Sequence, residues 1–203
     1  QGGVITNLTL TGGTLTTDLP ITGTLTVAGS AVVNTTNTVM GMLVITNGGR
    51  VSGPLVVAAG AELVFGGGRI DQWVRVEGGG LLTSVGASLG KQLWGSVTNA
   101  GTVRQTGWGL HLIGSVAENQ AGGLWDIQDD SHVYWNGVET FYNKGTLRKS
   151  GGSGLSQFNP RLVNTGLVEV QTGTLYLNGG GGQLDGTINV ASGARLDLVS
   201  GPF

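Results

Sequence analysis

The sequence contains no cysteine, little charge and no long apolar run. Without cysteine, the chain has neither disulfide bridges nor cysteine-ligated metal sites. Charged residues make up 11% of the chain, whereas soluble domains average about 25%. The formal net charge of −2 gives no electrostatic reason to expect a nucleic acid as partner. No apolar stretch approaches the ~18 residues that suggest a membrane span, so we expect no membrane insertion.

A helical pattern is also missing, and glycine is abundant. No window of about eleven residues keeps a helical period without a glycine break. Glycine supplies 40 of the 203 residues without the Gly-X-Y period of collagen. Leu, Val and Ile recur too regularly for a disordered tract. Most of them stand in short alternating pairs bounded by Gly or Asn, such as Leu175 and Leu177, and this pattern predicts short half-buried strands.

Internal repeats predict how these strands are arranged. Three segments read nearly alike, each as a strand, a small-residue turn and a second strand: Gly23–Ala31, Gly53–Ala61 and Gly186–Ala194. Apolar anchors recur at a nearly constant interval along the chain, at Val103, Trp125, Leu147, Val168 and Ile188. A second apolar position follows each anchor at a short and nearly fixed separation, at Leu110, Val133, Leu155, Leu175 and Leu196. A third position precedes an Asn-containing turn, at Val97, Phe141 and Leu162.

Three apolar columns at this interval predict an all-β fold, a parallel β-helix (β-solenoid) with about three short strands per rung of 17–24 residues. Leu8, Leu25 and Leu43 indicate the shorter rungs of the N-terminal third. The register between residues 50 and 82 stays open at this point. No linker is visible, so we expect a single solenoid domain over residues 1–203.

Two polar columns follow from the same register. The outward positions beside the anchors alternate in charge, which predicts a stabilising surface ladder and not an active site. They are Arg104, Asp126, Arg148, Glu169 and Asn189. Four asparagines recur at the turns, where Asn tolerates left-handed backbone, and stacking predicts an amide ladder inside or along one corner. They are Asn99, Asn119, Asn143 and Asn164.

The repeats of the last sixty residues carry a family resemblance. The segments YNKGTLRKSGGSG (Tyr142–Gly154), NTGLVEVQTGTL (Asn164–Leu175) and GTINVASGA (Gly186–Ala194) resemble repeats in large bacterial secreted proteins. Those proteins are autotransporter passengers and filamentous-haemagglutinin-type adhesins. The resemblance implies a right-handed β-helix at or outside a bacterial cell surface. Such repeats serve as stalks, adhesins and enzyme scaffolds, so the resemblance supplies no catalytic motif.

Aromatic residues gather in the middle of the chain and indicate one candidate site. All five tryptophans lie between residues 73 and 135, with acids nearby at Asp126, Asp129 and Asp130. Exposed rings stack on the apolar faces of sugars, and paired carboxylates are what glycoside hydrolysis requires. The candidate glycan-contact residues are Trp94, Trp108, Tyr134 and Trp135. The structural alternative places Trp125 and Trp135 in core columns and the acids in a turn.

Other chemistry finds little support in the sequence. The strand register pairs His111 with Tyr134 and leaves His132 at a turn, and a metal site would need further ligands. The stretch Val85–Gln92 has one residue too few between its glycines for a phosphate loop. We therefore predict no catalytic residues, no cofactor and no metal.

The leading hypothesis is a non-enzymatic extracellular or cell-surface β-solenoid, a structural or adhesive rod of a bacterial protein. Gln1 in place of an initiator Met, and the absence of a signal peptide, favour a processed chain or a segment. We expect no capping helix at either end. Uncapped strand edges favour self-association into filaments, or stacking on neighbouring rungs of a longer chain. The alternative is a carbohydrate-binding or polysaccharide-cleaving β-helix.

Overall fold

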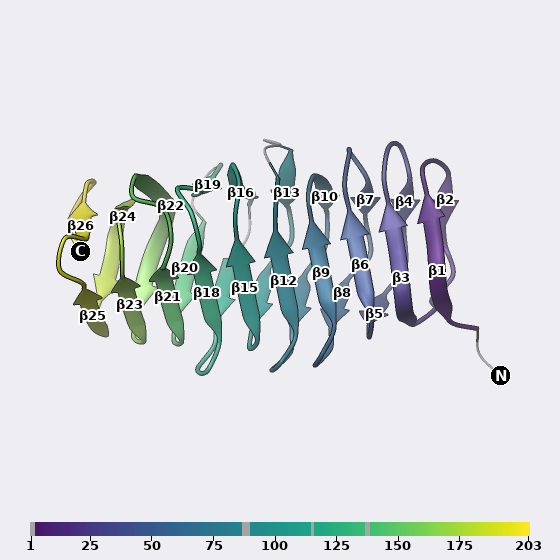
Figure 1. The fold of residues 1–203 in the computed structure, drawn as a ribbon, viewed down its shortest axis with the longest axis horizontal. Coiled ribbons are helices and arrows are strands. Elements are labelled where there is room, and N and C mark those ends of the chain that lie inside the picture. The colour runs from purple at the N-terminus through teal and green to yellow at the C-terminus, as the bar shows by residue number, and fades with distance from the viewer. Residues whose placement is uncertain (1–2, 87–89, 115, 137–138) are drawn as a thin grey trace.

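The chain folds into a β-solenoid of about nine turns (Figure 1). The computed structural model describes residues 3–86, 90–114, 116–136 and 139–203, and these residues contain 26 strands and no helix. Every strand pairing among them is parallel, and the strands belong to one continuous sheet system. In Figure 1 the near strands point up the page and the chain returns on the far side as it advances toward the C-terminus, so the coil is right-handed.

The rungs stack into three faces. The first face consists of β1 (Ile5–Leu10), β3 (Ile21–Val27), β6 (Met42–Ile45), β9 (Glu62–Phe65), β12 (Leu81–Ser84), β15 (Thr102–Gln105), β18 (Leu124–Ile127), β21 (Thr146–Lys149), β23 (Leu167–Val170) and β25 (Thr187–Val190). The second consists of β2 (Thr14–Leu15), β4 (Val32–Val33), β7 (Arg50–Val51), β10 (Gly68–Ile70), β13 (Lys91–Leu93), β16 (Gly109–Leu112), β19 (His132–Trp135), the first half of β22 (Leu155–Asn164), the first half of β24 (Thr174–Leu184) and β26 (Arg195–Leu198). The third consists of β5 (Asn37–Val39), β8 (Leu55–Val57), β11 (Val74–Val76), β14 (Val97–Asn99), β17 (Val116–Asn119), β20 (Thr140–Asn143) and the second halves of β22 and β24.

The predicted register of the first apolar column is confirmed, and strand pairing extends the column to the N-terminal rungs. Strand pairing stacks its members in order, one from each rung, and settles the register between residues 50 and 82. Members between the two terminal rungs are buried, whereas Ile188 in the last rung is 38% exposed. The column is Leu8, Leu25, Leu43, Leu63, Leu82, Val103, Trp125, Leu147, Val168 and Ile188.

The predicted second column is wrong in its C-terminal half. Leu110 pairs with Val133 as expected, but Val133 pairs with Phe158 and not with Leu155. Leu155 pairs with Thr174 instead and is only half-buried. The turn before β22 is longer than the turn before β19, and this shifts the strand relative to its neighbour. Leu175 and Leu196 do pair with each other, in an adjacent inward column.

The predicted asparagine ladder exists and lies inside the rod. Asn99, Asn119, Asn143 and Asn164 are all 0 to 1% exposed. Along the series, each Nδ2 donates to the Oδ1 of the next asparagine, at 2.8, 2.8 and 2.6 Å. Backbone carbonyls accept from the same amides, as Thr146 O does from Asn119 Nδ2 at 3.0 Å. The ladder thus satisfies buried amides that would otherwise cost about 1–3 kcal/mol each.

The charged column has the predicted register but not the predicted exposure. Arg104 pairs with Asp126, Asp126 with Arg148 and Arg148 with Glu169. Asp126, however, is only 2% exposed, and Arg148 donates to both of its oxygens, at 3.1 and 2.8 Å. Burial raises the pKa of Asp126, but hydrogen bonds from Arg148, Gln128 and Ser150 outweigh burial and bring the pKa below its usual value.

Candidate ligand-binding face

Aromatic and imidazole side chains gather over three neighbouring strands of the second face, β13, β16 and β19. Outward positions pair Gln92 with His111 and His111 with Tyr134. Trp94 follows the end of β13, Trp108 precedes the start of β16, and Trp135 ends β19. The four predicted glycan-contact residues therefore lie on three consecutive rungs. We call this surface the aromatic face, made of Gln92, Trp94, Trp108, His111, His132, Tyr134 and Trp135.

The tryptophans of this face are exposed. Trp94, Trp108 and Trp135 are 42, 49 and 44% exposed, while Trp125 is buried and packs edge-on against Phe141 at 5.0 Å between ring centroids. The prediction that Trp125 is a core residue is confirmed, and the structural alternative for Trp135 is wrong. Strand alternation would turn Trp135 inward beside Leu112, but β19 ends at this residue and the pleat no longer fixes its direction. Rings that remain in water offer contact area for a ligand.

Two contacts hold the Trp94 ring in place. The guanidinium of Arg69 lies over the ring, 3.9 Å from its centroid, in a cation–π arrangement. The indole Nε1 donates to Gln92 Oε1 at 3.0 Å. Arg69 is itself fixed by an ion pair with Asp71. Part of one ring face is therefore covered, and the rest of the indole is presented to solvent in a defined orientation.

Tyr134 owes its position to a glycine. Gly109 has φ +140°, and a Cβ there would come within 2.9 Å of Tyr134 Cε2 and 2.5 Å of His132 O. The absent side chain leaves room for the tyrosine ring over β16. The ring then lies 4.7 Å from the His111 ring and 5.4 Å from the His132 ring, measured between centroids. One tyrosine thus joins both histidines of the chain into a single cluster.

The surroundings of both histidines lower their pKa and so favour the neutral imidazole over the charged form. His132 begins strand β19, so its predicted place in a turn is wrong, and its Nδ1 accepts the Gln157 N–H at 2.9 Å. Burial lowers the pKa of His132, against the raising effect of Asp129 and Asp130. Burial and the charge of Lys91 lower the pKa of His111. Neutral imidazoles offer both donors and acceptors, as polar recognition of hydroxyl groups requires.

A buried lysine lies beneath this face. Lys91 is 0% exposed, and its Nζ donates to the carbonyls of Val85 and Gly86 at 3.1 and 3.2 Å, with Thr106 O at 3.5 Å. Burial lowers its pKa to about 8, although the charge of Asp129 acts in the opposite direction. Its ammonium group satisfies carbonyls of two neighbouring turns.

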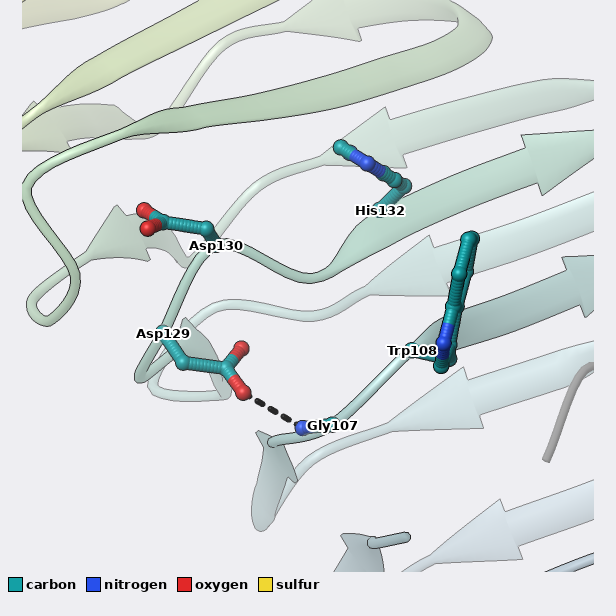
Figure 2. A pocket seen from close by; sticks show the side chains of 5 residues that line it. All are labelled: Gly107, Trp108, Asp129, Asp130 and His132. Atoms are coloured by element: carbon teal, nitrogen blue, oxygen red, sulfur yellow. Dashed lines mark hydrogen bonds between the residues drawn. The ribbon is translucent and has the colours of Figure 1, made fainter. Parts of the chain in front are cut away.

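A hollow of about 460 Å³ opens at one edge of the aromatic face, lined by Gly107, Trp108, Asp129, Asp130 and His132. Figure 2 shows Trp108 just before β16 and His132 at the start of β19, with the two carboxylates at the neighbouring turn pointing to different sides. We call it the first hollow. Its aromatic wall and its acids are the combination that the sequence predicts for a sugar site.

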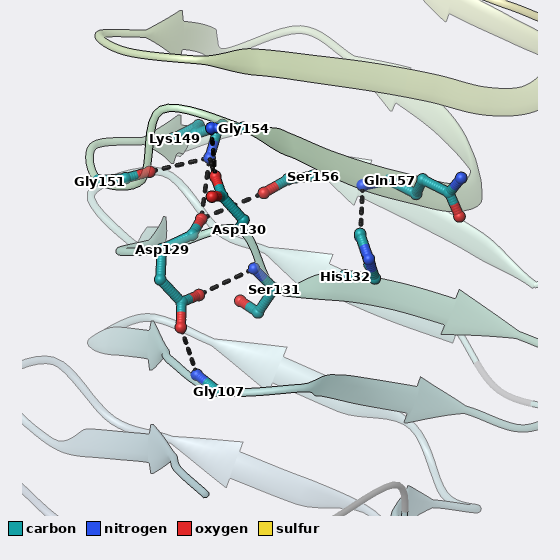
Figure 3. Close-up of polar contacts among 10 residues, drawn as sticks. All are labelled: Gly107, Asp129, Asp130, Ser131, His132, Lys149, Gly151, Gly154, Ser156 and Gln157. Carbon is teal, nitrogen blue, oxygen red and sulfur yellow. Dashed lines mark hydrogen bonds and ion pairs between the residues drawn. The ribbon is translucent and has the colours of Figure 1, made fainter. Parts of the chain in front are cut away.

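Backbone and lysine donors hold the two carboxylates of the first hollow (Figure 3). Asp129 accepts the N–H groups of Gly107 and Ser131, at 2.5 and 2.9 Å. Asp130 Oδ1 accepts the Gly154 N–H at 2.9 Å and an ion pair from Lys149 Nζ at 3.0 Å. Lys149 is 0% exposed and also donates to two turn carbonyls. Both acids therefore stabilise turns between stacked rungs, as the structural alternative predicted for these two.

A second hollow, of about 170 Å³, lies at the opposite edge and was not predicted from the sequence. Trp135, Glu139, Asn159, Arg161, Asn178, Gly179 and Gly180 line it. Glu139 and Arg161 belong to adjacent rungs, where the Arg161 N–H donates to Glu139 O at 3.0 Å. In the sequence, Glu139 and Arg161 are one rung length apart. An acid and a base at this spacing are the pattern from which the pair could have been predicted. The aromatic face thus runs between two hollows that each include a tryptophan and a carboxylate.

The described residues contain no group of three or more His, Asp or Glu side chains placed to hold a metal ion. No helix within the described ranges is long and apolar enough to cross a membrane. Comparisons with protein-family models, with curated proteins and with solved structures gave no match to this chain. The geometry of the solenoid and of its aromatic face is therefore the basis for any functional argument.

Proposed function

We propose that this chain is a non-enzymatic, extracellular adhesive rod that binds glycan along its aromatic face. The observation that carries the proposal is the exposure of Trp94, Trp108 and Trp135 at the ends of three consecutive strands of one face. Adjacent rungs are separated by ~4.8 Å, so Trp94 and Trp135, at the C-terminal ends of β13 and β19, lie about 10 Å apart along the rod. Trp108 lies before the start of β16, about 17 Å from them along the strand direction at ~3.3 Å per residue. An oligosaccharide of several residues, laid diagonally over the face, reaches over such distances and meets several rings at once.

The polar groups between the rings suit the same ligand. Gln92, His111 and Tyr134 follow one another on the outer side of β13, β16 and β19. They supply amide, imidazole and phenol groups without a net charge, because burial keeps the His111 pKa low and the Tyr134 pKa high. Neutral donors and acceptors beside aromatic rings favour hydroxyl-rich ligands over ionic ones.

The rival function, polysaccharide cleavage, has less support in the geometry. A glycosidase needs one carboxyl group as acid and a second as base or nucleophile. Both oxygens of Asp129 accept backbone N–H groups, and Asp130 is held by Lys149 and Gly154. Carboxylates engaged in turn contacts are poorly placed to exchange protons with a substrate. Binding without cleavage is the reading that these contacts favour.

The rod role and the location rest on separate arguments. A continuous apolar core with an internal amide ladder makes a stiff spacer, which suits presentation of a binding face away from a surface. The repeats of the last sixty residues resemble those of bacterial adhesins and autotransporter passengers, which supports an extracellular or cell-surface location. Among the described residues the terminal rungs pair on one side only: β1 with β3 and β2 with β4 at one end, and β25 with β23 and β26 with β24 at the other. We propose that they stack on a second copy or on neighbouring rungs of a longer chain.

Affinity measurements on neutral hexasaccharides of glucose, mannose, galactose and N-acetylglucosamine test the proposal. Trp94→Ala and Trp108→Ala should each weaken binding about tenfold, the loss of roughly 1.4 kcal/mol of ring contact. Trp73→Ala is the matched control, because Trp73 is 41% exposed but lies outside the aromatic face. Equal affinities for all three variants would refute the face as the binding surface. Release of new reducing ends, lost in Asp129→Asn, would establish the enzymatic alternative.

A further inference from the structure

Glu139 is a buried carboxylate with one oxygen unsatisfied. The residue is 3% exposed and lines the second hollow. Its Oε1 accepts the Gly114 N–H at 2.6 Å, whereas its Oε2 has no hydrogen-bond partner among the residues that the structure describes. A buried charged oxygen without a partner costs more than a neutral one, and native proteins keep few such groups without a functional reason. Glu139 therefore brings to the wall of the second hollow a buried acceptor oxygen that lacks a donor.

The opposite charge in this hollow is also free of an ion pair. Arg161 donates from Nε to Gly181 O at 2.6 Å, and no carboxylate of the described residues forms a salt bridge with it. Glu139 and Arg161 therefore both retain charge that an incoming group can engage. Near them, Asn159 Oδ1 accepts from Asn178 Nδ2 at 3.3 Å, which leaves the Asn159 amide nitrogen as a further donor.

These groups define the chemistry of a ligand. The Glu139 carboxylate would repel an acidic ligand, and the Arg161 guanidinium would repel a cationic one. A ligand with a net charge of either sign is therefore disfavoured by one group of the same hollow. A neutral ligand with adjacent hydroxyl groups donates to Glu139 and accepts from Arg161 and Asn159. The exposed ring of Trp135 supplies an apolar wall. At about 30 Å³ per water, 170 Å³ equals about six waters, the room for one sugar ring and not for a chain.

We propose that the second hollow is a subsite for a single neutral sugar residue, with Glu139 accepting a hydrogen bond from a sugar hydroxyl and Trp135 stacking on the ring. This inference deepens the proposed function and rests on it, because it assigns the sugar class that one end of the aromatic face takes. It adds a charged acceptor beside the neutral donors and acceptors of Gln92, His111 and Tyr134. Charge-assisted hydrogen bonds to hydroxyls are about twice as strong as neutral ones, so Glu139 should dominate the affinity of this subsite.

Saturation-transfer NMR and calorimetry with methyl glycosides test the subsite on the intact chain. The neutral probes are the methyl glycosides of glucose, galactose, mannose and N-acetylglucosamine, and the charged probes are glucosamine and methyl glucuronoside. At least one neutral probe should bind more tightly than both charged ones. Glu139→Gln should weaken this binding at least tenfold while the variant stays folded, because glutamine keeps an acceptor for the Gly114 N–H. Trp135→Ala should have a similar effect, and Trp73→Ala should change affinity less than twofold.

Three results would refute the subsite. Absence of saturation transfer to every neutral probe, preference for a charged probe, or unchanged affinity in Glu139→Gln refutes the assignment. A failure of the subsite assignment can be told apart from a failure of the proposed function. Hexasaccharide binding that depends on Trp94 and Trp108 but not on Glu139 would leave the aromatic face standing without the subsite. Loss of monosaccharide binding in Glu139→Gln, with no hexasaccharide binding in the parent chain, would leave only the subsite.

Discussion

Replacing Asn119 by aspartate exchanges a hydrogen-bond donor for an acceptor at the centre of the asparagine ladder. In the parent chain, Asn119 Nδ2 donates to Asn143 Oδ1 at 2.8 Å and to Thr146 O at 3.0 Å. Its Oδ1 accepts from Asn99 Nδ2 at 2.8 Å, a contact that aspartate keeps. The side chain is 0% exposed, so water cannot replace what is lost. Asn119→Asp thus removes the donor and adds a titratable group without changing the shape of the core.

The expected cost follows from those two bonds, the shorter ones that Nδ2 donates; its third, to Gly123 O, is 3.3 Å long. Each acceptor left unsatisfied costs about 1–3 kcal/mol, so the two together cost about 2–6 kcal/mol. The new carboxyl group, buried beside two oxygens, has its pKa raised in the folded state because its charged form is disfavoured. A raised folded pKa makes the variant most stable below the unfolded value of about 3.9 and least stable above the folded value. Each pH unit between the two values removes about 1.4 kcal/mol.

Urea unfolding of the parent chain and of Asn119→Asp, each at pH 4 and pH 7, measures this effect. The difference in unfolding free energy between the two proteins should be larger at pH 7 than at pH 4. Asn178→Asp is the control, because Asn178 is only half-buried and lies outside the ladder, and its effect should be small at both pH values. A pH-independent difference below about 1 kcal/mol for Asn119→Asp would refute the idea that the ladder amides matter.

Three further outcomes test the fold and one tests the ends of the rod. Leu147→Asp should cost several kcal/mol in a urea melt by burying an unpaired charge, and a change within about 0.5 kcal/mol would contradict the first column. Arg148→Ala should cost about 3–5 kcal/mol, because it leaves the Asp126 carboxylate buried without its partner, and a surface-like loss below about 1 kcal/mol would argue against burial. Lys91 has a folded pKa near 8 against 10.5 when unfolded, so the unfolded chain binds more protons between these values. Thermal unfolding should show stability rising from pH 8 to pH 10, and Lys91→Met should remove the rise. Light scattering over a dilution series should show mass rising with concentration, less so in Val190→Asp, and a constant monomer mass would exclude stacking of copies.

Much of the fold follows from the sequence because stacked rungs repeat their chemistry at a fixed interval. Val103, Trp125 and Leu147 could be aligned because each starts the same short pattern after a glycine turn. The second column failed at Leu155 for a physical reason. The inward positions at the start of β22 are Ser156 and Phe158, so a buried serine interrupts the apolar pattern and leaves Leu155 as the nearest apolar residue. Ser156 is tolerated inside because its Oγ donates to Asp129 O at 3.2 Å, a contact that only the stacked turns create.

The candidate site was harder to foresee, since turn geometry decides it. Trp94 and Trp108 were named because they are aromatic, but their exposure depends on where β13 ends and β16 begins. Asp126 was expected at the surface, but it is buried within β18 under contacts from Arg148 and Gln128. No recognisable motif surrounds Glu139 in the sequence. Its place in the second hollow becomes visible only in the folded chain, where the stacking of the rungs brings Arg161 beside it. Patterns of apolar residues report the core and carry little information on corners.

The growth of the rungs along the rod has a consequence for how such a surface could be altered. Rungs near the N-terminus, such as the one from Leu25 to Leu43, are shorter than those that carry the aromatic face, such as the one from Val103 to Trp125. In the longer rung, β16 and β17 have four residues each where β4 and β5 have two and three, and the turn before β18 is longer than the turn before β6, while the first apolar column continues through both rungs. The lengths of the second and third faces are therefore a variable that the stacking of the first face does not fix. A solenoid of this kind can gain or exchange a recognition surface by lengthening these strands and turns, without redesign of the apolar column of its first face.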